Sequence, residues 1–234
     1  MTAAGTLERS RPDAVTDPTP AWLRHGPLAV HGGVVVVPGL PDVTACQLLA
    51  VEARQVYPSA SRQVCDVPTL VDGRGGAPRR ALTSAGGGNA QDAVYASAWL
   101  HRYLSELCGG TVRPSGNRGS YSYYVEHGDH LDLHLDIVTC DVTVITVLAD
   151  STAPDSPGGA LVVRRRSVGI PLGELRAGGH GDDEEVVKAP PGHSVVILGG
   201  IVPHRVEPIA GPGQRVISAL CFQALPDLSA SRSG

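Results

Sequence analysis

Side chains that can bind a metal ion alternate with aliphatic side chains over residues 130–137, which read His-Leu-Asp-Leu-His-Leu-Asp-Ile. Successive side chains of an extended strand point to opposite faces, so the two histidines and two aspartates are expected to share one face. Burying that polar row without partners would cost free energy. We therefore expect the row to face either water or a metal ion.

A histidine and an aspartate two positions apart on a strand can bind one ion from the same side, but a third ligand must come from elsewhere. His204 is the candidate, because its strand is expected to return to the same mouth of a two-layer barrel. Two histidines and one carboxylate leave positions open on the ion, which suits non-haem Fe(II) and oxygen chemistry. A zinc hydrolase would also fit, although the HExxH spacing of a helical zinc site is absent. Iron is the preferred ion.

Further patterns accompany this segment in a fixed order: residues 128–136, the apolar run 142–148, the Gly-Gly-Ala-Leu-Val of 158–162, and 191–215, which starts with Pro-Gly. Each pattern is weak alone, but their order and spacing together are specific. With them, residues 121–223 resemble the double-stranded β-helix core of the Fe(II)/2-oxoglutarate-dependent oxygenases, in its prolyl-hydroxylase-like form.

The resemblance implies roles for four residues. The HxD…H triad of the family falls on His134, Asp136 and His204, which would bind the iron. Its cosubstrate-binding arginine falls on Arg215, eleven residues after His204. A planar guanidinium can hold the distal carboxylate of 2-oxoglutarate through two charge-assisted hydrogen bonds.

Two HxD copies compete for the metal, because His130 and Asp132 repeat the pattern of His134 and Asp136. In the family, the metal-binding histidine follows the glycine that matches Gly128 by six residues, which selects His134. The earlier pair is then expected further along the same face, either solvated or lining the entrance to the site.

The second anchor of the cosubstrate carboxylate departs from the family pattern. Many relatives have a serine two residues after the arginine, but that position is Ile217 here, and Ser218 should point to the opposite face. A phenol from the strand before the metal-binding strand is the preferred substitute, and the candidates are Tyr121, Tyr123 and Tyr124. Ordinary packing with a satisfied hydroxyl is the alternative role for each of them.

The resemblance implies an enzyme, a dioxygenase that uses Fe(II), 2-oxoglutarate and O2 to oxidise an unactivated C–H bond, with release of succinate and CO2. Hydroxylation is favoured, because halogenating relatives lack the carboxylate that Asp136 supplies here; desaturation or cyclisation by the same oxidant stays open. The expected substrate is a small metabolite, such as an amino acid or a biosynthetic natural-product intermediate. Hydroxylation of a peptidyl residue is the alternative, and a non-catalytic metal-binding barrel is a hypothesis of another class.

The elements that must position these residues are helices followed by many short strands. A buried strand is predicted over 33–39, and helices over 42–56, with Asp42 or Thr44 as cap, and 91–108. Strand-like segments then follow near 119–126, 130–138, 142–149, 160–165, 194–199, 201–207 and 214–223. This order predicts a mostly β fold with supporting helices (α+β), a sandwich or barrel. The resemblance specifies a double-stranded β-helix, a jelly-roll or cupin-like core.

The remaining segments are expected to be less regular. Residues 1–24 are predicted to form a disordered or loosely packed arm, whose end Trp22 and Leu23 attach to a single domain over 25–234. Within that domain, residues 40–110 would supply the helical support and 111–224 the barrel. The Gly-rich stretch 59–89 is a candidate lid, and specificity should also depend on the loops 151–157 and 167–185.

Composition excludes several classes of partner. A chain of 234 residues with 42% hydrophobic content can build one sizeable core, and its formal charge of −4 argues against nucleic-acid binding. No apolar run reaches the length of a membrane span, and the start lacks the apolar core of a secretory signal. We therefore expect a soluble, cytoplasmic protein; its oligomeric state is left open.

The five cysteines are widely spaced and include no CxxC pair. An odd number without regular spacing is typical neither of a disulfide framework nor of a structural zinc site. The sequence therefore predicts reduced thiols.

Overall fold

The computed structural model describes residues 21–69, 74, 76–153, 156–178 and 183–225. Its helices are α1 (Pro27–Val30), α2 (Val43–Val56), α3 (Asn89–Tyr95), α4 (Ala98–Cys108) and α5 (Leu172–Ala177), with short 3-10 helices at Ala21–Arg24, Tyr57–Ser59 and Arg165–Ser167. Its strands are β1 (Val34–Pro38), β2 (Ser61–Cys65), β3 (Arg80–Gly86), β4 (Val112–Tyr124), β5 (His130–His134), β6 (Val142–Asp150), β7 (Leu161–Arg164), β8 (Glu184–Val187), β9 (His193–Ile197), β10 (His204–Val206) and β11 (Arg215–Ala224).

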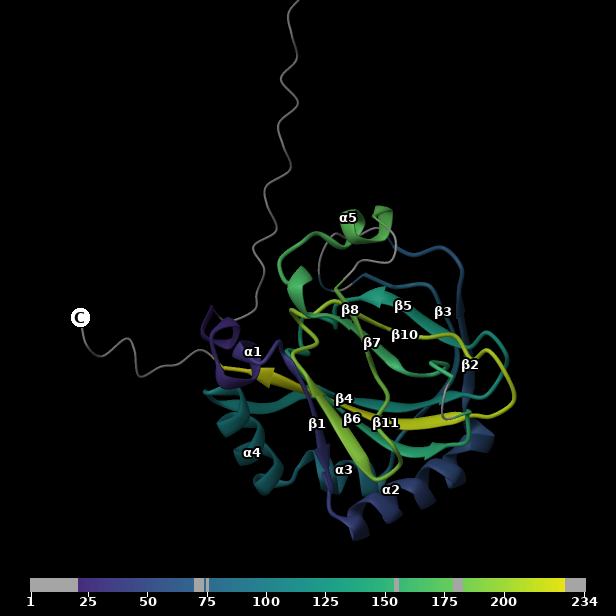
Figure 1. Cartoon of the computed structure of the whole chain (residues 1–234). Helices are drawn as coiled ribbons and strands as arrows, with labels where there is room; N and C mark the ends of the chain where they lie inside the picture. Colours follow the sequence, from purple (N-terminus) through teal and green to yellow (C-terminus); the bar gives the residue numbers. More distant parts are fainter. Residues whose placement is uncertain (1–20, 70–73, 75, 154–155, 179–182, 226–234) are drawn as a thin grey trace, which may run out of the picture.

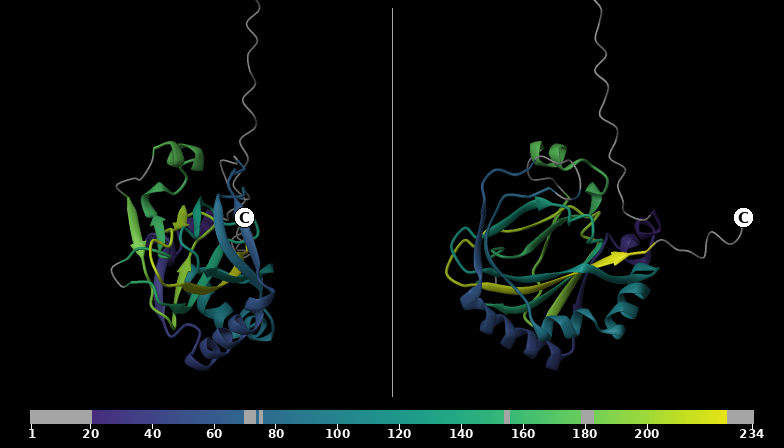
Figure 2. Two further views of the ribbon diagram at one scale, coloured as in Figure 1. Left: turned by 90° about the vertical axis from the view of Figure 1, so that its right-hand side faces the viewer. Right: turned by 180° about the vertical axis from the view of Figure 1, so that it is seen from behind.

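The strands form two layers that face each other (Figure 1). The large layer has the order β1-β9-β6-β11-β4-β3, and the small layer has the order β5-β10-β7-β8. Strand β3 joins the layers, because residues 83–86 pair with β4 whereas Arg80 and Ala81 pair with β5. Strand β2 pairs with β3. We call the side of each layer that faces the other its inner face, and the region between them the barrel interior (Figure 2).

Helix α2 lies against the outer face of the large layer (Figure 1). It begins where predicted, because the Asp42 carboxylate accepts a hydrogen bond from the Ala45 backbone N–H at 2.9 Å and so caps the helix. Its buried residues, Leu49 and Ala53, belong to the main hydrophobic core. The helix thereby supports the large layer from outside.

Helices α3 and α4 continue this cover and occupy the stretch predicted as one helix over 91–108. The prediction of a single helix is wrong, because the backbone turns at Ala96 and Ser97. The Ser97 hydroxyl then caps α4 by accepting a bond from the Leu100 N–H at 3.4 Å. Helix α4 ends at Gly109, whose φ of +77° favours glycine.

Two predicted loops contain regular structure. Residues 59–89 include β2 and β3, so the prediction of a structureless lid is wrong for that part. The residues of β2 are largely polar and exposed. This edge strand therefore lacks the alternation of hydrophobic and polar residues from which a strand is predicted. Similarly, 167–185 contains α5 and the first residues of β8, where Glu184 forms an ion pair with Arg164.

The start of the described chain packs onto the body of the protein. Leu23 is fully buried in the main core, and the Trp22 indole N–H donates to the Leu225 carbonyl at 2.8 Å. The predicted attachment by these two residues is therefore confirmed, whereas the rest of the predicted arm, 1–20, lies outside the described residues. Among the helices of the described ranges, none is long and apolar enough to cross a membrane.

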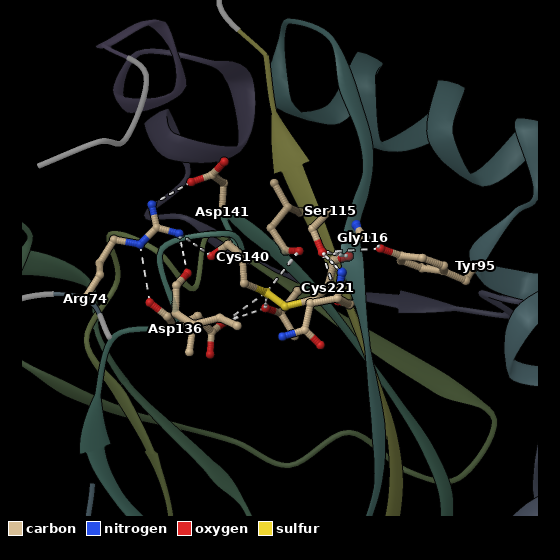
Figure 3. The surroundings of a disulfide bond; sticks show 12 residues. Arg74, Tyr95, Ser115, Gly116, Asp136, Cys140, Asp141 and Cys221 are labelled. Atoms are coloured by element: carbon tan, nitrogen blue, oxygen red, sulfur yellow. Dashed lines mark hydrogen bonds and ion pairs between the residues drawn. A yellow bond between two sulfur atoms is a disulfide. The ribbon is translucent and has the colours of Figure 1, made fainter. Parts of the chain in front are cut away.

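A disulfide joins Cys140, before β6, to Cys221 in β11 (Figure 3). The prediction of reduced thiols is wrong for this pair, while Cys46, Cys65 and Cys108 are free. The two bonded cysteines are 81 residues apart, so no local spacing could have revealed them. They meet because β6 and β11 are paired neighbours in the large layer.

The cap of α2 gives a test of how much this supporting helix contributes. Replacing Asp42 by Ala removes the acceptor for the Ala45 N–H, and we expect the free energy of unfolding to fall by about 1 kcal/mol in urea titrations. Asp66→Ala, at an exposed position, serves as the control for loss of a carboxylate. Equal stability of the two variants would contradict the role of the cap.

Candidate metal centre

Strand pairing brings two histidines together on the inner face of the small layer. His134 at the end of β5 lies opposite His204 at the start of β10, and their ring centroids are 4.2 Å apart. Asp136 follows two residues after β5, where its backbone N–H donates to the Gly199 carbonyl at 2.8 Å. Its Oδ1 lies 3.7 Å from the Nε2 of each histidine. One ligand atom from each residue therefore lies within 4.8 Å of the other two.

Both imidazoles are held with Nε2 directed at the shared point. The Nδ1 of His134 lies 2.8 Å from the Asp132 carbonyl, and the Nδ1 of His204 lies 2.9 Å from the Val202 carbonyl. Because a carbonyl only accepts hydrogen bonds, Nδ1 carries the proton in both rings. Each Nε2 lone pair is then available to a cation, as in histidines that bind metals through one nitrogen and are oriented through the other.

The Asp136 carboxylate has a separate task for each oxygen. Oδ2 accepts a hydrogen bond from the Thr143 hydroxyl, while Oδ1 faces the two imidazoles. A Cβ at Gly199 would lie 1.8 Å from Oδ2, so only glycine allows the carboxylate to approach so closely. The residue type at 199 is therefore part of what positions the aspartate.

Electrostatics keep these groups in the states that bind a cation. Burial lowers the pKa of His204 to about 4, assisted by the neighbouring His134, so its imidazole is neutral at pH 7. Burial alone would raise the pKa of Asp136, but the adjacent histidines and the Thr143 hydroxyl lower that pKa well below its usual value. The donor set of two imidazole nitrogens and one carboxylate fits a divalent transition metal with open positions, such as Fe(II).

A bulge in β5 breaks the alternation predicted for residues 130–137. Register with β10 pairs His134 with His204 but Leu131 with Val206, so Leu131 and His134 both lie on the inner face. Leu133 and Leu135 instead pack outside against Leu172 and Leu175 of α5. The expectation that His130 and Asp132 share a face with His134 is therefore wrong, because the extra residue reverses the orientation of the side chains that precede it.

Arg215 lies at the start of β11, buried at 3% exposure on the inner face of the large layer. Its Nη1 forms an ion pair with the Asp150 carboxylate, and its Nη2 donates to the Ala189 carbonyl at 3.1 Å. Gly159 lies against this side chain: a Cβ at position 159 would be 2.9 Å from the Arg215 Cδ. The Gly159 backbone φ of +73° also favours glycine. These contacts fix the plane of the guanidinium while using two of its five N–H donors.

The three candidate tyrosines divide between the faces of β4. The hydroxyl of Tyr121 donates to Glu52 at 2.7 Å and that of Tyr123 to the Ala53 carbonyl at 2.6 Å, both on α2 outside the barrel. Tyr124 has the opposite orientation, is 2% exposed and pairs in register with Arg215. Burial raises its pKa, so the phenol is protonated at neutral pH.

The expected orientation of Ser218 is confirmed. Its hydroxyl accepts a hydrogen bond from the Gln91 side chain of α3 at 2.9 Å, on the outer face. Ile217, one residue earlier, pairs with Ser122 and Val147 on the inner face. No serine of β11 therefore stands beside Arg215 in the barrel interior.

Arg74 is a contributor that the sequence did not indicate (Figure 3). Its guanidinium forms a buried ion pair with Asp141 at 2.6 Å and donates to the carbonyls of Ile137 and Cys140, both at 2.7 Å, and of Asp136 at 3.3 Å. Asp141 also accepts a bond from the Ala224 N–H at 2.8 Å. The turn after Asp136 is thus tied both to Arg74 and to the end of β11.

No family model matches the chain, and no curated protein matches it in sequence. Solved structures match at low identity. SnoN, described as a non-heme alpha ketoglutarate dependent epimerase from nogalamycin biosynthesis, has a TM-score of 0.61 at 13% identity over 87% of this chain and 81% of that chain. A Pseudomonas putida prolyl-4-hydroxylase has a TM-score of 0.54 at 17% identity over 82% and 93%.

HygX from Streptomyces hygroscopicus, solved with nickel, 2-oxoglutarate and hygromycin B, has a TM-score of 0.52 at 13% identity over 84% of each chain. These likenesses give the fold. The chain is a mostly β protein with supporting helices and has the double-stranded β-helix of these structures, as predicted.

The hydrogen bond from Thr143 to Asp136 gives a test of the metal centre. Thr143→Val keeps the shape of the side chain but frees Oδ2, and we expect Mn(II) affinity, measured by calorimetry, to fall about tenfold or more. Thr146→Val is the matched control, because Thr146 lies on the same strand but contacts Ser194. Unchanged affinity in the Thr143 variant would show that its hydroxyl does not position Asp136.

Proposed function

We propose that this chain is an Fe(II)- and 2-oxoglutarate-dependent dioxygenase, an oxidoreductase that hydroxylates a small molecule. The observation that carries the proposal is the convergence of His134 Nε2, Asp136 Oδ1 and His204 Nε2 on one point. A buried arginine on the inner face of the opposite layer adds a site for a carboxylate. The fold likeness supports the combination, because HygX has that fold and was solved with nickel and 2-oxoglutarate.

In this proposal, His134, Asp136 and His204 hold the iron through one atom each. Iron bound there supplies the O2-dependent oxidation of a C–H bond. The protein contributes a neutral imidazole at His204, an ionised carboxylate at Asp136 and fixed orientations for both. The carboxylate at position 136 favours hydroxylation over halogenation, because it fills a position that a halide would need.

Arg215 is proposed to bind the distal carboxylate of 2-oxoglutarate. Its contacts with Asp150 and Ala189 hold the guanidinium in one plane and leave donors for a two-bond contact with the ligand. Tyr124 is the preferred second anchor, since the hydroxyls of Tyr121 and Tyr123 are bonded to α2. Ile217, two residues after Arg215 on the same face, would supply an apolar wall.

The proposed substrate is a small metabolite, such as an amino acid or a natural-product intermediate. Two structures with this fold support a small molecule: HygX was solved with hygromycin B, and SnoN with Fe3+, alpha ketoglutarate and nogalamycin RO. Hydroxylation is our proposal for this chain, since SnoN itself is described as an epimerase.

Anaerobic addition of Fe(II) and 2-oxoglutarate tests the proposed function directly. We expect a visible charge-transfer band in the wild-type protein and none in His134→Ala, because that variant lacks one of the three ligands. His130→Ala is the matched control, since its imidazole bonds to the Gly128 carbonyl and lies on the outer face. Absence of the band from the wild type, or its persistence in His134→Ala, would refute the assignment.

Arg215→Ala tests the cosubstrate anchor separately from the metal. We expect 2-oxoglutarate to bind about 100-fold more weakly, because two charge-assisted hydrogen bonds are lost, while Mn(II) affinity stays within about twofold. Arg113→Ala, which removes an exposed arginine from β4, controls for charge. If both variants bind 2-oxoglutarate equally well, the anchor lies elsewhere.

A further inference from the structure

Arg80, the first residue of β3, points into the barrel interior. It pairs in register with Leu131 of β5, which lies on the inner face next to Val206. It also has the same orientation along β3 as Ser84, which pairs with Ser122 on the inner face of β4. Both neighbours of β3 therefore place the Arg80 side chain inside.

No group in the described parts of the chain pairs with the Arg80 guanidinium. Its Nε is buried without a hydrogen-bond partner, and no hydrogen bond or ion pair joins its side chain to another described residue. The guanidinium of Arg215, by contrast, is bonded to Asp150 and Ala189. A buried donor of a charged group without a partner costs free energy, so the Nε of the half-buried Arg80 is available to a ligand.

Hydroxyl groups lie further along the same face of β3 and β4, beyond the buried Leu82. Ser84 and Ser122 lie directly opposite each other on the inner face, and Ser120 precedes Ser122 by two residues. All three are half-buried, and their hydroxyls make no hydrogen bond within the described residues. We call these residues the polar wall: Arg80, Ser84, Ser120 and Ser122.

The polar wall lies between the metal centre and the proposed cosubstrate anchor. Leu131, opposite Arg80, precedes His134 by three residues of strand, which is about 10 Å at most along the chain. On the other side, Ser122 pairs with Ile217, two residues after Arg215. A small molecule that contacts these serines would therefore lie beside the space between the metal centre and Arg215 that the proposed cosubstrate spans.

We propose that Arg80 binds an anionic group of the substrate, a carboxylate or phosphate, and that the serines of the polar wall bind its polar groups. This inference rests on the proposed function and narrows its substrate class to small anions. A guanidinium suits such a group, because two parallel N–H donors match two oxygens. The same chemistry would fit the distal carboxylate of 2-oxoglutarate, and the experiment separates these two sources.

The experiment uses full-length protein loaded with Mn(II) and saturating 2-oxoglutarate, titrated with acetate and with inorganic phosphate and followed by thermal shift. We expect at least one anion to stabilise the wild type in a saturable way and to bind Arg80→Gln at least about tenfold more weakly. Arg79→Gln is the matched control, because it removes the same charge from the exposed neighbouring position. Arg80→Lys, which keeps the charge, should retain part of the binding and guards against misfolding of the first variant.

Binding of 2-oxoglutarate is measured in the same variants. Weaker 2-oxoglutarate binding in Arg80→Gln, with anion binding intact, would assign Arg80 to the cosubstrate and overturn the proposal. Equal anion binding by Arg80→Gln and Arg79→Gln would overturn it as well. Failure of the wild type to bind 2-oxoglutarate would instead count against the proposed function. Anion binding by Arg80 would still be tested in that case, because the titration can be repeated on the protein without metal or cosubstrate.

Discussion

The position of Asp136 is the constraint on which the rest of the site depends. His134 and His204 are placed by strand pairing, but Asp136 lies beyond the end of β5, where no ladder fixes it. Its place is set by its contacts with Gly199 and Thr143 and by the turn that follows, which the buried ion pair between Arg74 and Asp141 holds against the end of β11. A buried pair of this kind contributes geometry more surely than stability, because desolvation offsets much of the attraction.

The candidate ligands His134, Asp136 and His204 could be placed from sequence because the family resemblance supplied their spacing, and each lies at or just beyond a strand end. The inward direction of Arg215 and the outward direction of Ser218 followed from the alternation of side chains along a strand alone. Both residues lie in β11, which stays paired with its neighbours as far as Phe222. Asp42 as a cap was equally local. Signals of this kind need only neighbouring residues to be read.

The features that sequence could not supply are non-local or break a period. The bulge in β5 depends on register with β10, and the disulfide depends on two strands being neighbours across 81 residues of chain. Arg74 stands in a Gly-rich segment without periodicity, and its acceptors around Asp136 come together only when the turn after that residue is folded. The sequence did not predict the edge strand β2, because its polar, exposed residues give no hydrophobic pattern.

The bulge also makes this strand sensitive to residue count rather than to residue identity. Leu131 and His134 face inward only because one extra residue separates them, while Leu133 turns out toward α5. A one-residue deletion between these two inward positions would leave them two residues apart, so regular pleating would keep both of them on the inner face. A one-residue insertion would instead leave two extra residues opposite β10, so that Leu131 or His134 would lose its pairing with Val206 or His204.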